Sequence, residues 1–325
     1  MSPNACRSRR SGPFVNAIPP NPFVSIGIPT YNRADVVGRA IDSVLQQQYK
    51  PLEIVVVDDG SIDSTRAVLA RYEAEGHIRV VEHPKNQGVG AAKNSLLDAM
   101  SGDYGGILDS DDELLPGAID ACLRAFREHG PAICQAFGNC VDPGTGELTG
   151  HGMDAAGFVR FEDAVCGRFR GEYWQLFRLA DLGARRFHPE ALTAEGLVWH
   201  AMLKEKPGYY IGEPVRRYER RRGDRVSMHR TDARTLHGRM MAYKVYLDAF
   251  EHDLRQLCPN RFADLAEELA KWQARGGHRL DATVTLASAV RAAPRWSAVR
   301  AAAVVLLPLT ISDALAGVWG RRAEQ

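Results

Sequence analysis

Short apolar runs alternate with helically spaced segments over the first 130 residues of the chain. Apolar runs at 23–28, 52–57 and 78–82, and a fourth that ends at Ile107 and Leu108, are short and rich in Val and Ile, which is typical of buried strands. Between the first two, apolar residues recur at helical spacing, as in Val37, Ile41 and Val44. Strands that alternate with helices predict an α/β fold with a doubly wound, mostly parallel sheet.

Polar or small residues come after each of these predicted strands. The segments are 29–32, 58–61, 86–90 and 109–112. Since the carboxyl ends of parallel strands meet at one edge of a sheet, we expect these four segments to form a single pocket.

The last of these segments carries three carboxylates, Asp109, Asp111 and Asp112, directly after a buried strand. Carboxylates in such a place repel one another and lose hydration, so a compensating cation is expected. A hard divalent ion with oxygen ligands is the usual one. An acidic loop without a metal is the more common case for a bare DxD, so neighbouring residues must support the metal site.

The pattern changes after residue 130. Residues 131–171 are irregular, with a turn at 142–150 and a short helix with loop within 158–170. Helical spacing returns at 192–203, and two apolar stripes beyond residue 230 predict long helices. The stripes are Tyr243, Leu247, Phe250, Leu254 and Leu257, then Phe262, Leu265, Leu269 and Trp272. We therefore expect a disordered arm at 1–22, a first half at 23–130, a second half of the same domain at 131–230, and a helical C-terminal region at 231–325.

Composition describes an ordinary soluble globular protein, with 325 residues, 45% hydrophobic and 25% charged residues, and a net charge of +1. We expect no nucleic-acid partner. Charge is nevertheless concentrated between Arg216 and Arg239, where nine arginines stand against three acidic residues. That region is expected to meet an anion.

Compartment and membrane contact can also be predicted from the sequence. Six cysteines without a CxxC pair predict free thiols in a reducing compartment, and the first 22 residues lack the apolar segment of a secretory signal. The apolar run at 301–311 contains Pro308 and is too short to span a bilayer. With Trp296, Trp319 and flanking arginines it predicts an interfacial anchor. A cytoplasmic protein, peripheral on the inner face of the plasma membrane, is the expectation.

The sequence lacks two common nucleotide-binding motifs. No GxGxxG follows the first strand and no GxxxxGK[ST] is present, so neither a dinucleotide cofactor nor P-loop chemistry is indicated.

Four motifs in order carry a family resemblance. IGIPTYNR at 26–33, VVVDDGSIDST at 55–65, KNQGVGAAKN at 85–94 and LDSDDELLPGAI at 108–119 resemble the successive motifs of family-2 glycosyltransferases with the Rossmann-like GT-A fold. The resemblance covers residues 23–130. It implies an inverting, metal-assisted transferase that moves a sugar from a nucleotide-diphosphate sugar, UDP-linked, to a hydroxyl of a glycan or lipid-linked acceptor. Synthesis of a cell-surface polysaccharide or glycoconjugate is the implied setting.

The same resemblance assigns the site residues. It places the donor on Pro29, Thr30, Tyr31, Asn32, Asp59, Lys93, Asp109 and Ser110, and Mg²⁺ or Mn²⁺ on Asp111 and His229. Because a loop that closes over a leaving diphosphate needs cations, Arg222 is expected to join the donor site. Asp59 is suited to hydrogen-bond a base or ribose, and Lys93 to pair with a phosphate or to reach a base. Lys93 stands where the family commonly has Arg, so a bidentate contact is not expected there.

The segment 194–204 resembles the family helix that bears the catalytic base. Glu195 is its only acid, and Gly196 stands where the family often has a second one. The role of the base therefore falls to Glu195, with Asp181 and Glu190 as alternatives. The other interpretation of Glu195, that it only stabilises the N-terminus of the helix electrostatically, stays open. The arginines of 216–225 allow three interpretations: a solvated face, a diphosphate clamp, or a contact with anionic lipid.

Two other functions remain open at this stage. Gly196 in place of an acid favours a non-catalytic sugar-nucleotide-binding or scaffold protein. A nucleotidyltransferase would also use a sugar-nucleotide pocket with carboxylates, but it ordinarily has a Gly-rich, basic loop after the first strand, which PTYNR does not resemble.

Overall fold

The computed structural model describes residues 21–192, 194–218, 232–294 and 297–306. Within them the elements follow in the order β1 (Val24–Thr30), α1 (Val37–Leu45), β2 (Leu52–Asp58), α2 (Thr65–Ala74), β3 (Arg79–Glu82), α3 (Val89–Ala99), β4 (Tyr104–Ile107), β5 (Glu113–Leu114), α4 (Ala118–His129), a 3₁₀ turn (Gly130–Ala132), β6 (Gln135–Val141), β7 (Gly157–Val159), α5 (Phe161–Val165), β8 (Tyr173–Arg178), α6 (Leu179–Leu182), α7 (Gly196–Leu203), β9 (Gly208–Arg217), α8 (Ala233–Leu257), α9 (Pro259–Arg275), α10 (Arg279–Ala292) and α11 (Ser297–Leu306). The strands and helices expected in the first 130 residues are confirmed.

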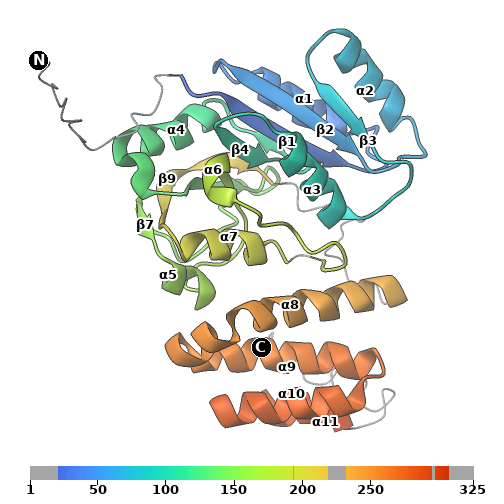
Figure 1. The fold of residues 1–325 in the computed structure, drawn as a ribbon, viewed down its shortest axis with the longest axis vertical. Helices are drawn as coiled ribbons and strands as arrows, with labels where there is room; N and C mark the ends of the chain where they lie inside the picture. The colour runs from blue at the N-terminus through green and yellow to red at the C-terminus, as the bar shows by residue number, and fades with distance from the viewer. Residues whose placement is uncertain (1–20, 193, 219–231, 295–296, 307–325) are drawn as a thin grey trace, which may run out of the picture.

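The strands form one mixed sheet in the order β3-β2-β1-β4-β8-β6-β9-β5, with β7 paired to β9 (Figure 1). β1 lies parallel to both β2 and β4, and β2 lies parallel to β3. β8 joins β4 in the antiparallel direction, as do β6 to β8 and β5 to β9. The doubly wound parallel arrangement is thus a property of the first half, whereas the second half is mixed, because β8 is antiparallel to β4 and β6 while β6 is parallel to β9.

Both faces of β1 and β2 are covered, which explains their mostly apolar sequences. On β2, Ile54 and Val56 pack in the cluster that includes α1 and α4, while Val55 and Val57 pack against Ala92 and Leu96 of α3. Successive side chains of a strand point to opposite faces, so each face meets its own helices.

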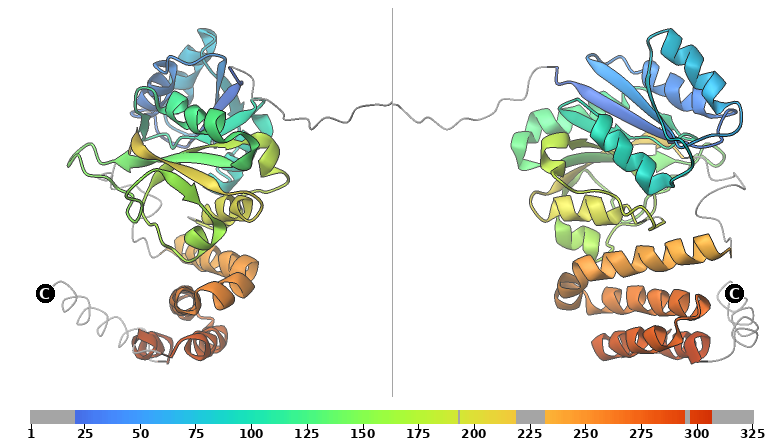
Figure 2. Two further views of the ribbon diagram at one scale, coloured as in Figure 1. Left: turned by 90° about the vertical axis from the view of Figure 1, so that its left-hand side faces the viewer. Right: turned by 45° about the vertical axis from the view of Figure 1, so that its right-hand side comes forward.

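A layer of four helices, α8 to α11, lies below the sheet domain (Figures 1 and 2). The two predicted stripes supply its contacts, since Leu247, Phe250 and Leu254 of α8 pack with Phe262 and other residues of α9 and with α5 and α7. Within the described part of the chain, no helix combines the length and apolarity that a bilayer span requires.

The first residues of the expected interfacial anchor belong to α11, and the prediction is wrong for those that are buried there. Ala301 and Val305 of α11 are buried against α9 and α10, so this part of the apolar run at 301–311 is a helix-packing surface. Trp296, Trp319 and residues 307–325 lie outside the described residues, as does the arm at 1–20.

The prediction of free thiols is wrong for two of the six cysteines. Cys166 at the end of α5 and Cys258 between α8 and α9 form a disulfide, with Cα atoms 5.6 Å apart. Residues 92 positions apart in the chain are brought together here by the packing of α5 on α8, which spacing alone did not indicate. Cys122, Cys134 and Cys140 are free and buried.

Candidate active site

The loops after β1 and β2 are joined by Asn32. Its backbone φ of +51° lies in the left-handed region, which Asn tolerates better than most residues. In this conformation its N–H donates to Ser61 Oγ at 2.9 Å and its Oδ1 accepts from Ile62 N–H at 2.9 Å. Beside it, Pro29 and Thr30 are buried and Tyr31 is 38% exposed. Tyr31 is therefore the side chain of this loop that is available to stack on a ligand.

Asp59 organises the entrance to α3. Its carboxylate accepts hydrogen bonds from the backbone N–H groups of Gln87 (2.9 Å) and Gly88 (2.8 Å), and it lies 2.6 Å from His83 Nδ1. The other ring nitrogen of His83 lies 2.8 Å from Ser95 Oγ. His83 thus bridges Asp59 at the end of β2 and Ser95 on α3. These contacts fix the 86–88 loop against the end of β2.

Lys93 joins two carboxylates that are far from it in the sequence. Its ammonium, buried at 5% side-chain exposure, lies 3.2 Å from Asp109 Oδ1 and donates a hydrogen bond to Glu195 Oε1. Burial lowers the pKa of Lys93, but the charges of Asp109 and Glu195 outweigh it and raise that pKa above its usual value. For Asp109, burial raises the pKa, and Lys93 and Arg216 lower it further than burial raises it.

Glu195 is exposed enough to meet a ligand, at 49% side-chain exposure. It immediately precedes α7, where its carbonyl accepts from Val198 N–H and Trp199 N–H. With Lys93, Val89, Gly90, His188 and neighbouring residues it lines a small pocket of about 20 Å³. Glu195, Lys93 and Asp109 thus come from α7, α3 and the end of β4 to one place.

Asn94 holds the segment before Glu195 over α3. Its Nδ2 donates to Phe187 O at 2.9 Å and its Oδ1 accepts from Phe187 N–H at 2.8 Å. One turn earlier, a Cβ on Gly90 would lie 2.7 Å from His188 O, so glycine is required for the approach. The contacts hold residues 187–189 against the helix that carries Lys93.

His200 anchors α7 from the opposite side. Its Nδ1 lies 2.8 Å from the Tyr246 hydroxyl on α8. Burial, assisted by the charge of Arg261, lowers the pKa of His200 to about 4. The histidine is therefore neutral at pH 7, and this contact is a neutral hydrogen bond.

Arg216 fixes the acidic turn from β9. The guanidinium lies 3.2 Å from Asp112 and 3.3 Å from Glu172, and its Nε donates to Cys140 Sγ at 3.1 Å. The Arg216 and Asp112 side chains are 5% and 2% exposed. The three interpretations given above for 216–225 do not apply to Arg216, because it is a buried partner of the turn.

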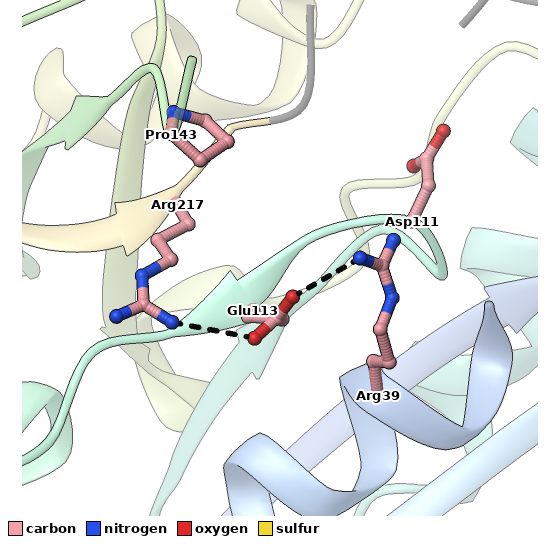
Figure 3. A pocket seen from close by; sticks show the side chains of 5 residues that line it. All are labelled: Arg39, Asp111, Glu113, Pro143 and Arg217. Carbon is pink, nitrogen blue, oxygen red and sulfur yellow. Dashed lines mark ion pairs between the residues drawn. The ribbon is translucent and has the colours of Figure 1, made fainter. Parts of the chain in front are cut away.

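Asp111 faces a different space from Asp109. It lines a pocket of about 290 Å³ together with Arg39, Glu113, Pro143 and Arg217 (Figure 3). Glu113 lies between the two arginines, with Arg39 Nη1 at 3.6 Å and Arg217 Nη1 at 3.5 Å. The turn therefore borders the larger pocket through Asp111, and it is linked to the smaller pocket by the ion pair of Asp109 with Lys93, which lines that pocket.

The oxygen ligands of this turn fit a divalent cation. Mg²⁺ is usually bound by one or two carboxylates and completes its shell with substrate phosphates and water, and Asp111 lines a pocket large enough for such groups. In the described ranges there is no cluster of three or more His, Cys, Asp or Glu side chains that could hold a metal by themselves. His229 and Arg222 lie outside the described residues.

The alternative bases are placed differently from Glu195. Asp181 is 2.5 Å from Lys206 and 3.4 Å from Arg178, with 15% of its side chain exposed. Glu190 is 62% exposed and lies 3.5 Å from His237 at the start of α8. Neither contacts Lys93 or Asp109, so the geometry favours Glu195 among the three.

Sequence reasoning missed Asn94, His83 and the pairing of Arg216 with Asp112. Asn94 is the last residue of the KNQGVGAAKN segment, so the motif contained it without indicating its role. For Arg216 the signal was weak, because a buried arginine and an exposed one look alike in an Arg-rich stretch.

Comparisons with known proteins agree with this geometry. A family model described as glycosyl transferase family 2 matches residues 25–176. The chain is 32% identical over 236 residues to the GalNAc(5)-diNAcBac-PP-undecaprenol beta-1,3-glucosyltransferase of Campylobacter jejuni, an alignment that covers 71% of this chain and 72% of that protein. It is 37% identical over 153 residues to a chondroitin synthase of Escherichia coli, covering 46% of this chain and 22% of that longer protein.

Solved structures show the same fold. A crystal structure of S. aureus TarS 1–349 in complex with UDP-GlcNAc matches with a TM-score of 0.59 and 16% identity, over 83% of this chain and 88% of that one. A second crystal structure of S. aureus TarS 1–349 matches with a TM-score of 0.57 and 18% identity, over 83% of this chain and 81% of that one. The predicted GT-A fold with a helical C-terminal region is confirmed.

Proposed function

The chain belongs to glycosyl transferase family 2, and on that premise we propose that it is an inverting enzyme that transfers a sugar from a UDP-linked donor to a hydroxyl of a glycan or lipid-linked acceptor. The setting is the synthesis of a cell-surface polysaccharide or glycoconjugate. The observation that carries the proposal is the convergence of Lys93, Asp109 and Glu195 from three separate elements. Lys93 is buried, whereas the carboxylates of Asp109 and Glu195 are partly exposed and can therefore contact a ligand. A cluster that only stabilised the fold would not need exposed carboxylates.

The donor lies along the strand ends in this proposal. Tyr31, Asn32 and the loop held by Asp59 border the nucleoside, while Lys93 and the acidic turn border the sugar and diphosphate. The UDP-GlcNAc complex of the fold neighbour TarS favours UDP as the nucleotide. The Campylobacter relative, whose name includes a PP-undecaprenol-linked glycan, favours a lipid-linked acceptor.

Glu195 acts as the general base. It takes the proton from the acceptor hydroxyl as that oxygen bonds to the anomeric carbon and the bond from that carbon to the diphosphate oxygen breaks. A single displacement inverts the centre and needs no protein nucleophile. Lys93 donates a hydrogen bond to Glu195 Oε1 and so holds this carboxylate at the site.

A divalent ion is part of the proposal. Asp111 would hold Mg²⁺ or Mn²⁺, with His229 as a further ligand, and the bound ion supplies positive charge that stabilises the departing diphosphate. Calorimetry of UDP binding tests this. The affinity is expected to depend on Mn²⁺ and to fall strongly in Asp111→Ala, and unchanged affinity there would remove the metal assignment.

Glu195→Gln tests the catalytic role. Because a general base typically contributes about a hundred- to ten-thousand-fold in rate, turnover should fall by a factor in that range while UDP affinity stays near that of the wild type. Glu190→Gln is the matched control, since it makes the same chemical change on an exposed residue nearby. Turnover of Glu195→Gln within a few-fold of the wild type would place the base elsewhere.

A non-catalytic sugar-nucleotide-binding protein is the second candidate, favoured by Gly196 where the family often has an acid. Both candidates predict thermal stabilisation by UDP with Mn²⁺, because a ligand that binds only the folded state raises the melting temperature. Release of sugar from a panel of UDP-sugars, lost in Glu195→Gln, distinguishes the enzyme from the binder.

Peripheral attachment to an anionic membrane completes the proposal. The burial of Ala301 and Val305 within the helical layer places the informative truncation after residue 306, so that α11 is kept. In a liposome sedimentation assay the full chain should pellet with anionic vesicles and a chain ending at residue 306 should not. Equal partitioning of both would refute the tether.

A further inference from the structure

The pocket beside Asp111 has two arginines for which catalysis by Glu195 gives no role. Arg39 comes from α1 and Arg217 from the end of β9, and their side chains are 50% and 52% exposed. Figure 3 shows them on opposite sides of the Glu113 carboxylate. Because Glu113 and Arg217 are cross-strand neighbours of β5 and β9, the carboxylate is fixed between the two guanidinium groups.

The contacts to Glu113 leave much of both guanidinium groups unused. At 3.6 and 3.5 Å they are ion pairs longer than ordinary hydrogen bonds, and about half of each arginine side chain is exposed. Half-exposed pairs of this kind contribute little to stability. Each arginine retains N–H donors in a planar fork that matches a phosphate group.

Size and charge define what the pocket accepts. Its volume of about 290 Å³ is at the lower end for small-molecule sites, which suits a phosphate or diphosphate group better than a whole nucleotide. The two arginines exceed the charge of Glu113 by one positive unit. A cation on Asp111 would offset the remaining carboxylate, so that the pocket favours an anion.

From this arrangement we infer that Arg39 and Arg217 form a phosphate-binding subsite beside the acidic turn. The subsite itself does not depend on the proposed function; only the identity of the molecule that carries the phosphate rests on it. In an inverting displacement the leaving group departs on the side opposite the base. Glu195 is linked to the turn through Lys93 and Asp109, whereas this pocket adjoins the turn at Asp111. The pocket therefore lies where the leaving phosphate is expected. The phosphate chain of the nucleotide is the source that this geometry favours, and the diphosphate of a lipid carrier is the other.

Binding of inorganic pyrophosphate to the full chain tests the subsite without any transfer reaction. In the double variant Arg39→Gln/Arg217→Gln, the affinity measured by calorimetry in the presence of Mg²⁺ should fall about tenfold or more, as expected for lost charge-assisted contacts. The matched control is Arg66→Gln/Arg124→Gln, which removes the same charge from two exposed, ion-paired arginines outside the pocket.

The control separates a local contact from a change in net charge. Equal losses in the two double variants, both with melting temperatures near that of the wild type, would overturn the subsite. A failure of Glu195→Gln to lower turnover would not, because pyrophosphate binding is measured independently of the base.

Decyl diphosphate and UDP identify the source of the phosphate. If the subsite holds the nucleotide phosphates, the two ligands compete, and the Arg39→Gln/Arg217→Gln variant loses affinity for UDP. If it holds the carrier diphosphate, decyl diphosphate binds in the presence of saturating UDP, and the variant loses that binding alone. Both results support a phosphate subsite, and retention of both affinities at the control level contradicts it.

Discussion

Lys93 and Arg216 are buried cations that hold different sides of one acidic turn, and they differ in how far the aspartate that each one pairs with is exposed. Both side chains are 5% exposed. The partners of Lys93, Asp109 and Glu195, are 40% and 49% exposed, whereas Asp112 beside Arg216 is 2% exposed. The same kind of ion pair is therefore open to a ligand on the Lys93 side and closed to it at Asp112.

Because of this difference, the three aspartates of the turn have different roles. Asp112 is enclosed with Arg216 and can only support the turn, while Asp109 reaches a pocket through Lys93 and Asp111 lines a second pocket. A buried charge that loses its partner is strongly destabilising, whereas an exposed one is solvated by water. Variants on the two sides should consequently affect different measurements.

Arg216→Met is expected to have the largest effect. Removing this guanidinium breaks the buried ion pair with Asp112, and breaking such a pair typically costs about 3–5 kcal/mol in the free energy of unfolding. Urea denaturation measures the loss. Arg66→Gln, which breaks the exposed pair with Glu82, should cost less than about 1 kcal/mol. Similar losses in the two variants would show that Arg216 does not support the turn.

Lys93→Met should affect turnover more than folding. Without the ammonium, Asp109 and Glu195 lose their shared partner, and loss of charged hydrogen bonds of this kind predicts a fall in kcat of about ten- to a hundredfold. Steady-state kinetics measures it. Lys206→Met is the control, because it removes a lysine paired with Asp181 outside the site. A wild-type kcat in Lys93→Met would contradict an active role for the open pair.

At neutral pH the effect of His200 is the smallest of the three, because its contribution to stability changes only in acid. Since the pKa is lowered to about 4 in the folded protein, the unfolded chain binds a proton there between pH 6.5 and 4 that the folded protein does not. Stability is full above pH 6.5 and decreases toward pH 4, by at most about 1.4 kcal/mol per pH unit. His200→Gln should reduce this slope in urea titrations at several pH values. An identical slope in the variant would exclude His200 as its source.

The sequence determined the first half of the molecule in considerable detail. Local patterns were sufficient there, because strands buried on both faces are short continuous apolar runs and the helices between them show their own periodicity. Parallel connectivity then required the four strand-end segments to share one edge. Asp109, Lys93 and the loop at 29–32 could be grouped for that reason before any coordinates were known.

Tertiary structure alone decided how the second half completes the site. Glu195 lies 102 positions from Lys93, and its approach depends on Asn94 and Phe187 and on the close contact at Gly90. Arg216 pairs with Asp112 because β9 runs beside β5 and β6, and Cys166 meets Cys258 because α5 packs on α8. Contacts of this kind join residues that are distant along the chain. A local sequence pattern does not show which of several similar arginines, acids or cysteines will be buried when the chain packs. The sequence could therefore specify the chemistry of the site, while the enclosure of each charged group was fixed only by the folded chain.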